Sequence, residues 1–269
     1  MWYTPFRQTL FLDDFYKGVT VIDTIDLIVY YDTEFVLDTT KNIVIKERSI
    51  LEIGRSISKY FNYKCFQLDS LFKEYPDISP NDAAKSILDY ENTFPPSFYE
   101  SFFYNWPKGK FSVVGRIAAT DFKYEEDIPQ IKWKLLDSAT IIAGFHAQEA
   151  YCEFRGRFYD VWFTKDVPIS IGPWKFNGLP GLILSVKDKE GYYLFRFAGI
   201  SSPTVHHNCI WMPNYKFIPV TRQQYTEARK QITANAPLFQ NNYSGNTGIL
   251  IFPADDYQKR KLGNDFIER

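Results

Sequence analysis

The sequence has little of what usually reveals a protein's compartment or chemistry. Only three of its 269 residues are cysteine (Cys65, Cys152 and Cys209), which permits at most one internal disulfide and leaves the redox compartment open. No stretch reaches the roughly 18 apolar residues of a membrane-spanning helix. The formal net charge is −1, which gives no electrostatic reason to expect nucleic acid or an anionic membrane as a partner. We therefore predict neither a transmembrane segment nor a nucleic-acid partner.

Sequence signatures of catalysis and of cofactor binding are also missing. There is no Gly-x-Ser-x-Gly elbow and no glycine-rich phosphate loop. His146 and Cys152 would lie about 20 Å apart along one predicted strand, too far for a catalytic dyad. His207 and Cys209 could share a face and offer two metal ligands, which is weak support for a metal site. We predict no catalytic residue, no metal and no cofactor, and we favour a non-enzymatic protein.

Aromatic residues are abundant, at 18% of the chain, and they favour the half-buried surface of β-strands. From residue 110 onward, short polar or glycine-containing breaks separate the apolar runs, which is typical of an antiparallel meander. Residues 49–75 fit either a helix or a broken strand. Helices are predicted over residues 83–90 and, after the capping box that Thr221 and Gln224 form, to about residue 233. The predicted strands cover residues 19–30, 35–37, 42–45, 111–117, 131–136, 144–154, 158–164, 182–187, 192–198, 209–212 and 216–219.

A segment rich in glycine and proline precedes the strand predicted at residue 182. Pro180 and Gly181 fit the two central positions of a type II turn, because proline presets φ and glycine accepts the positive φ that follows. One interpretation is a rigid apolar corner leading into a core strand. The other is a rigid lip that presents Trp174 and Phe176 to a partner or ligand. The residues of this structural motif are Gly172, Pro173, Gly178, Leu179, Pro180, Gly181, Leu182 and Ile183.

Two charged runs stand out between the predicted strands. Residues 124–127 (Tyr-Glu-Glu-Asp) read as a solvated polar loop. Arg155-Gly156-Arg157 reads as a hairpin turn with exposed arginines, or else as a grip for an anion. The candidate binding residues are therefore Trp162, Trp174, Phe176, Arg155 and Arg157.

These motifs together resemble the GLPGLI family of envelope and secreted proteins of Bacteroidota. The signature hexapeptide is Gly178–Ile183, and the resemblance extends over residues 25–268, which indicates a single domain over residues 1–269 with an N-terminal extension at residues 1–20. One departure is Ala147, where family members often carry cysteine. The other matching segments are Leu51–Gly54, Ser58–Tyr60, Trp133, Leu135, Ile142–Phe145, Phe154–Tyr159, Trp162–Thr164, Gly172–Phe176, Asn264 and Ile267-Glu268.

The resemblance implies a signal peptide in the precursor and export to the periplasm, the outer membrane or the cell surface. Residues 1–5 show no such signal, so the alternative from the residues alone is a cytosolic chain. The order of elements also looks like that of periplasmic lipoprotein carriers. We therefore expect a mainly β fold, an antiparallel, strongly curved sheet or half-barrel with two or three peripheral helices.

The resemblance implies no established activity, so three functions remain open. The first is an accessory or binding component of an outer-membrane assembly, such as a TonB-dependent transporter. The second is a periplasmic carrier of a lipid or another hydrophobic ligand. The third is an enzyme of unrecognised type.

Overall fold

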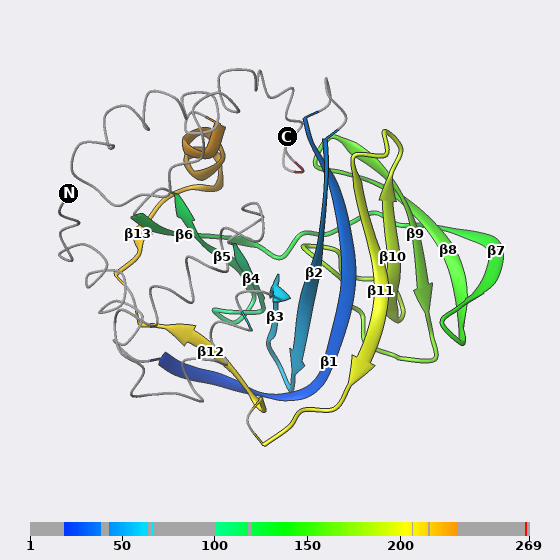
Figure 1. Ribbon diagram of the computed structural model, residues 1–269, viewed down its shortest axis with the longest axis horizontal. Helices are drawn as coiled ribbons and strands as arrows, with labels where there is room; N and C mark the ends of the chain where they lie inside the picture. The colour runs from blue at the N-terminus through cyan, green and yellow to red at the C-terminus, as the bar shows by residue number, and fades with distance from the viewer. Residues whose placement is uncertain are drawn as a thin grey trace, which may run out of the picture.

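The chain forms one large β-sheet in the computed structural model, which describes residues 19–38, 43–63, 66, 100–117, 120–205, 207–214, 216–230 and 267 (Figure 1). Thirteen strands are present in these residues. Their bounds are β1 Val19–Asp38, β2 Ile43–Gly54, β3 Ser58–Asn62, β4 Ser101–Tyr104, β5 Lys110–Ile117, β6 Thr120–Asp127, β7 Lys134–Ile142, β8 Phe145–Phe154, β9 Arg157–Thr164, β10 Leu182–Asp188, β11 Tyr193–Ser201, β12 Cys209–Pro213 and β13 Ile218–Pro219.

The sheet is open and almost entirely antiparallel. Its strand order is β13-β6-β5-β4-β3-β2-β1-β11-β10-β9-β8-β7, with β12 paired to β1 off this path. Only the short β13 is parallel to its neighbour, β6. Strands β7 to β11 are successive antiparallel neighbours, which confirms the predicted meander. The prediction of a mainly β, antiparallel fold is therefore confirmed.

Strand β1 organises the sheet because it has different partners along its 20 residues. Its first part, from Val19 to Thr24, pairs with β12, whereas its later part pairs with β2 on one side and with β11 on the other. Figure 1 shows the strand bending between these two parts. A register shift between Val21 and Asp23 and another between Ile25 and Leu27 lie at this bend, as expected of bulges that turn a strand.

The secondary structure departs from the predictions in a few places. The runs at 19–30 and 35–37 form one strand, and the ambiguous region after residue 49 contains the end of β2, a turn at residues 55–57 and β3. Strand β6 covers the run at residues 124–127 that was expected to be a loop. One helix, at residues 222–230, agrees with the capping box, in which Gln224 N–H donates to Thr221 Oγ1. The helix predicted at 83–90 lies outside the described residues.

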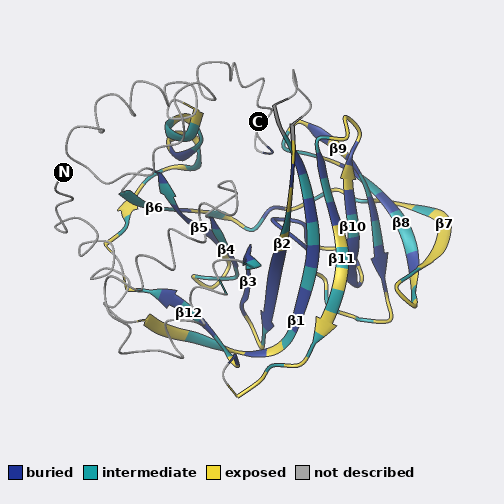
Figure 2. Ribbon diagram, viewed as in Figure 1, coloured by how far each residue is buried: buried dark blue, intermediate teal, exposed yellow. Residues whose placement is uncertain are grey.

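Buried residues run through the central strands of the sheet (Figure 2), and the buried apolar side chains form two clusters. Neighbouring residues of β1 divide between them: Val29 belongs to the larger cluster and Ile28 to a smaller one, as strand alternation requires. The larger cluster draws residues from β6 near one end of the sheet to β8 near the other, and from the segment between β9 and β10. That segment contains the glycine- and proline-rich motif.

Candidate functional site

Residues 170–178 fold into a small hairpin that inserts into the larger core cluster. Ile171 and Asn177 form its β-bridge, and the N–H of Gly172 donates to the carbonyl of Phe176 at 2.9 Å. Trp133 holds the second strand of this hairpin in place, because its indole N–H donates to the carbonyl of Asn177 at 2.8 Å. Trp174 adopts a φ of 53°, which turns the chain at the tip. We call residues 170–178 the core hairpin.

The corner after the core hairpin is tighter than a type II turn. The N–H of Gly181 donates to the carbonyl of Leu179 at 2.8 Å, an i to i+2 bond that defines a three-residue turn around Pro180. Gly181 has a φ of 153°, far from the value of about 80° expected in a type II turn. The type II prediction was therefore wrong. Glycine is needed because a Cβ there would lie 1.9 Å from the carbonyl oxygen of Thr164, where β9 ends.

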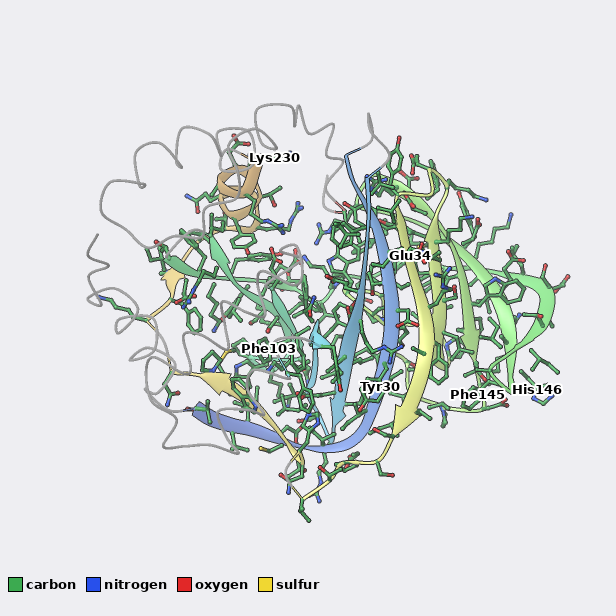
Figure 3. All side chains as sticks on the ribbon, in the orientation of Figure 1. Tyr30, Glu34, Phe103, Phe145, His146 and Lys230 are labelled. Carbon is green, nitrogen blue, oxygen red and sulfur yellow. The ribbon has the colours of Figure 1, made fainter. Side chains whose placement is uncertain are left out.

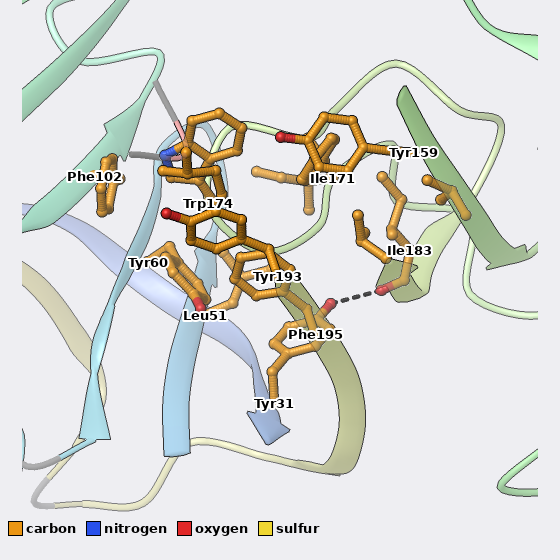
Figure 4. Packing of buried hydrophobic residues seen from close by; sticks show 14 of the residues in the cluster. Tyr31, Leu51, Tyr60, Phe102, Tyr159, Ile171, Trp174, Ile183, Tyr193 and Phe195 are labelled. Carbon is orange, nitrogen blue, oxygen red and sulfur yellow. Dashed lines mark hydrogen bonds between the residues drawn. The ribbon is translucent and has the colours of Figure 1, made fainter. Parts of the chain in front are cut away.

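Trp174 and Phe176 are core residues, with 5% and 0% of their surface exposed (Figure 4). The Phe176 ring packs edge-on against Tyr159 at 4.9 Å and against Trp174 at 5.3 Å between centroids. Neither ring reaches the surface in this conformation, so the expectation of an exposed lip is not supported. The placement agrees with the architectural interpretation of the motif, in which the segment fills the core and turns into β10.

Little space remains around the core hairpin. A cavity of about 10 Å³ borders Trp174 and Phe176, which is room for about one water molecule. The indole N–H of Trp174 is buried and has no hydrogen-bond partner among the described residues. In Figure 4 this nitrogen faces Phe102, which also lines the cavity. This part of the core thus has no room for a lipid chain.

Residues 124–127 were predicted to form a solvated loop, but all four belong to β6, and two of them, Tyr124 and Glu126, are not solvated. The Tyr124 ring is buried, and the Glu126 carboxylate is only 15% exposed and binds three cations. Lys175, at the tip of the core hairpin, is 0% exposed and donates to Glu126 Oε1 at 2.5 Å and to the Tyr124 hydroxyl at 3.0 Å. Arg155 donates to Glu126 Oε2 at 2.6 Å, and Arg222 approaches the same oxygen at 3.6 Å. This charged cluster joins the core hairpin to β6, to the β8–β9 turn and to the helix.

The β8–β9 turn was predicted correctly as a hairpin, but its arginines are not exposed. Arg155 and Gly156 both have positive φ, which fits a tight two-residue turn. Arg157 is 0% exposed and pairs with Asp188 at 2.8 Å, and it also donates to Glu190 at 3.3 Å. The second Asp188 oxygen accepts from the N–H of Tyr193 at 2.7 Å. Burial raises the pKa of the Asp188 carboxyl, while the Tyr193 N–H and Arg157 act in the opposite direction. Arg155 and Arg157 thus both make intramolecular ion pairs.

Of the predicted binding residues, Trp162 alone projects from the outer face of the sheet. Along β9 the side chains alternate, with Val161 and Phe163 buried and Phe158, Asp160 and Trp162 exposed or half-buried. On β8, Tyr151 is half-buried on this face and stacks on Phe158 with ring centroids 6.1 Å apart and planes 5° apart. We call Tyr151, Phe158 and Trp162 the outer aromatic face. Trp162 also packs partly against the larger core cluster.

Cys152 is buried in β8, and burial raises the pKa of its thiol to about 12. The thiolate is the reactive form, so Cys152 should stay unmodified when the native protein is treated with iodoacetamide at pH 8. The half-exposed Cys209 should be alkylated under the same conditions, and both should react in denaturant. Peptide mass spectrometry would measure the two rates. Equal native rates would contradict the buried placement of Cys152.

A buried polar pair, His207 and Glu52, lies on the other face of the sheet. His207 was considered only as a weak candidate metal ligand with Cys209, and its pairing with Glu52 was not predicted. His207 Nε2 lies 2.5 Å from Glu52 Oε1, with Glu52 only 1% exposed. The His207 ring also packs on Phe66 at 4.3 Å. Next to Glu52 across the strands is Lys59, which is buried with its ammonium 3.9 Å from the centre of the Trp211 ring. The described residues hold no group of three or more His, Cys, Asp or Glu side chains placed to bind a metal.

The structure brings together residues that lie far apart in the sequence. Lys175 and Arg155 meet at Glu126, and Trp174 with Phe176 fills the core beside them. Trp162 stays apart on the outer face. The acidic partners of these cations, Glu126 and Asp188, were not predicted. Each lies in a strand, and the alternation of side chains along that strand was the signal that could have placed the carboxylate inward.

The comparisons with known proteins bear on the fold of this chain and give no activity for it. Residues 142–185 match the model of a family described as a protein of unknown function (Porph_ging), and this segment includes the core hairpin and the Gly178–Ile183 motif. No curated protein matches the chain. Two structures of PNGF-II, in space groups P21 and C2, resemble it with TM-scores of 0.50 and 0.51 at 12% identity. The matches cover 77% of this chain and 33% and 32% of those chains, so this chain spans about a third of their length. The chain is thus similar in part to an uncharacterised family and, in fold, to one part of PNGF-II.

Proposed function

We propose that the chain is a non-enzymatic, exported protein of the cell envelope that binds an outer-membrane protein partner. The resemblance to the GLPGLI family supports export, and its motif lies within the segment that matches the family of unknown function. In the described residues, no helix has the length and apolar character needed to span a membrane. The proposed place of action is the periplasm, the outer membrane or the cell surface, with a strongly curved sheet as the scaffold.

The outer aromatic face is the observation that carries this proposal. By strand alternation in β8 and β9, Tyr151, Phe158 and Trp162 point away from the larger cluster, although Trp162 also packs partly against it, and Phe158 is 42% exposed. Exposed tryptophan and tyrosine side chains are enriched where proteins bind one another, since they bury a large area at a low cost in conformational entropy. Charges of both signs surround the rings, including the Lys189–Asp160 pair at 2.9 Å. These charges could form ion pairs with a protein partner whose surface carries charges of both signs.

The carrier alternative has less support. A lipid carrier needs an apolar cavity of several hundred Å³, whereas the core hairpin fills the centre of the larger cluster and leaves about 10 Å³ beside Trp174. An enzyme of unrecognised type would need a cleft in which reactive groups meet a substrate. The Lys175–Glu126 and Arg157–Asp188 pairs are instead enclosed within the fold.

Photo-crosslinking in the native host would test the proposed function. A photo-reactive phenylalanine analogue at Phe158 should give one discrete crosslinked product with a membrane protein. The Trp162→Ala substitution should reduce its yield about tenfold or more, as expected for a residue worth at least about 1.4 kcal/mol of binding. The same analogue at Ile218, which is 48% exposed at the other end of the sheet, serves as the matched control. Equal yields at the two positions, or no effect of Trp162→Ala, would contradict the proposal.

A further inference from the structure

Two rings of the outer aromatic face each lie directly opposite a carboxylate. In the β8–β9 register, Trp162 is opposite Glu149 and Phe158 is opposite Glu153. Directly opposed residues of antiparallel strands project on the same face of the sheet. Glu149 is half-buried and Glu153 is exposed, and neither makes an ion pair within the described part of the chain. Each of these two pairs thus presents an aromatic ring beside an uncompensated negative charge.

The row of residues between these two pairs carries positive charge instead. Tyr151 is opposite Asp160 in this row, and a lysine flanks the pair on each side. Lys134 of β7 is opposite Tyr151, and Lys187 of β10 is opposite Asp160. Both lysines are exposed, whereas the Asp160 charge is already compensated by Lys189 at 2.9 Å. Along the strands, the charge of this face therefore changes from negative to positive and back to negative.

The spacing of the three rows fits one extended chain segment. Glu149 and Glu153 are four residues apart on β8, which is about 13 Å at the rise of a β-strand. Residues i, i+2 and i+4 of an extended segment project on one side at the same spacing. Strand β8 is also accessible, since it lies at the margin of the molecule, where Figure 3 labels its first residues, Phe145 and His146. A segment lying along β8 and β9 can therefore meet all three rows.

Arginine is the cation that these ring–carboxylate pairs fit best. Its planar guanidinium stacks on an aromatic ring and still donates hydrogen bonds to a carboxylate in the plane of the group. Arginine is also enriched among the residues that contribute most to protein–protein binding. An acidic residue at i+2 would face Lys134 and Lys187.

We infer that the outer aromatic face binds an extended segment of a protein partner with arginine at positions i and i+4 and an acidic residue at i+2. One guanidinium stacks on Trp162 and pairs with Glu149, and the other stacks on Phe158 and pairs with Glu153. The acidic side chain pairs with the lysines of the middle row. This assignment rests on the proposed function, because it uses the same face, and it adds the chemistry of the partner.

Fluorescence anisotropy of a synthetic peptide tests the assigned chemistry. The probe is fluorescein-labelled Gly-Ser-Arg-Thr-Glu-Thr-Arg-Ser-Gly, titrated with the full chain. The matched control is Gly-Ser-Arg-Thr-Arg-Thr-Glu-Ser-Gly, which has the same composition and net charge but the wrong order of charges. The protein should bind the probe at least about tenfold more tightly than the control, as expected when one arginine contact is lost. Equal binding of the two peptides, or binding of neither at near-millimolar protein, would overturn the inference.

Substitutions on the protein test the two ring–carboxylate pairs. Glu149→Gln and Glu153→Gln should each weaken binding of the probe several-fold, with an unchanged circular dichroism spectrum. Glu125→Gln is the matched control, because Glu125 is a partly exposed acid of β6, near the other end of the sheet. It should leave binding unchanged. A loss with Glu125→Gln as large as with the other two would mean that only the overall charge matters, which would overturn the inference.

Crosslinking from Phe158 separates this inference from the proposed function. In the product formed in the native host, the partner peptide joined to position 158 should contain two arginines four residues apart. The double variant Glu149→Gln, Glu153→Gln should lower the yield about tenfold or more. If a membrane protein is crosslinked with an undiminished yield in this variant, the proposed function stands and the assigned chemistry fails. If no product forms, both fail.

Discussion

Replacing Gly181 by alanine should destabilise the protein by about 3–5 kcal/mol, because the added methyl group would overlap backbone atoms of β9. A Cβ at this position would lie 1.9 Å from the carbonyl oxygen of Thr164 and 2.6 Å from its carbonyl carbon. Both atoms belong to the backbone at the end of β9, so relief requires β9 and β10 to separate. Urea unfolding followed by circular dichroism would measure the loss. Since whole domains are stable by only about 5–15 kcal/mol, the variant should be close to unfolding in the cell.

Gly178→Ala is the matched control for this prediction. Gly178 belongs to the same motif and also has a positive φ, of 90°, but the nearest atom to an added Cβ is Trp133 Nε1 at 3.6 Å. Alanine there should cost about 1–2 kcal/mol, from the backbone conformation alone. If the two substitutions cost the same, the close approach of Gly181 to Thr164 would not be the reason for that glycine.

Replacing Arg157 by methionine should cost about 3–5 kcal/mol, because the buried Asp188 carboxylate then loses its counter-charge. Both side chains of the pair are 0% exposed. Equilibrium unfolding in guanidinium chloride would give the difference. Lys189→Met, which breaks the exposed pair with Asp160, should have a far smaller effect, because a surface ion pair of this kind contributes little to stability.

The double variant Arg157→Met, Asp188→Asn distinguishes lost charge pairing from lost packing. Asparagine removes the charge and can still accept the hydrogen bond from the Tyr193 N–H. The double variant should therefore recover most of the stability lost in Arg157→Met. If it is no more stable than the single variant, the guanidinium contributes mainly through packing against rings such as that of Tyr193, 5.0 Å away.

Much of the sheet could be predicted because aromatic and β-branched runs mark strands and their polar breaks mark turns. The meander from β7 to β11 follows from such local patterns, and so does the turn at Arg155 and Gly156. Periodicity alone did not predict which polar side chains turn inward. Arg157 is buried and Glu126 is mostly shielded from solvent, because Asp188 and Lys175, which lie 31 and 49 residues away, compensate their charges.

The candidate site was harder to predict than the sheet for the same reason. Trp174 and Phe176 fit both a rigid corner leading into a core strand, the favoured interpretation, and a surface lip, because aromatic side chains serve both. The hydrogen bonds that fold residues 170–178 inward decide between the two. Trp162 was singled out together with them, and it differs only because strand alternation in β9 turns it outward.

The pairing of β1 also governs when the fold can form during synthesis. Val21 pairs with Trp211 and Tyr31 pairs with Phe197. Strand β1 therefore cannot complete its pairing until residues at least 160 positions later in the chain have been synthesised. Contacts between residues so distant in sequence form slowly, because the chain loses the entropy of closing a long loop before the strand pairing stabilises it. Until β11 leaves the ribosome, one edge of β1 stays open to other chains. The delay would suit the proposed export, because a chain that has not completed its sheet stays unfolded and can still be translocated.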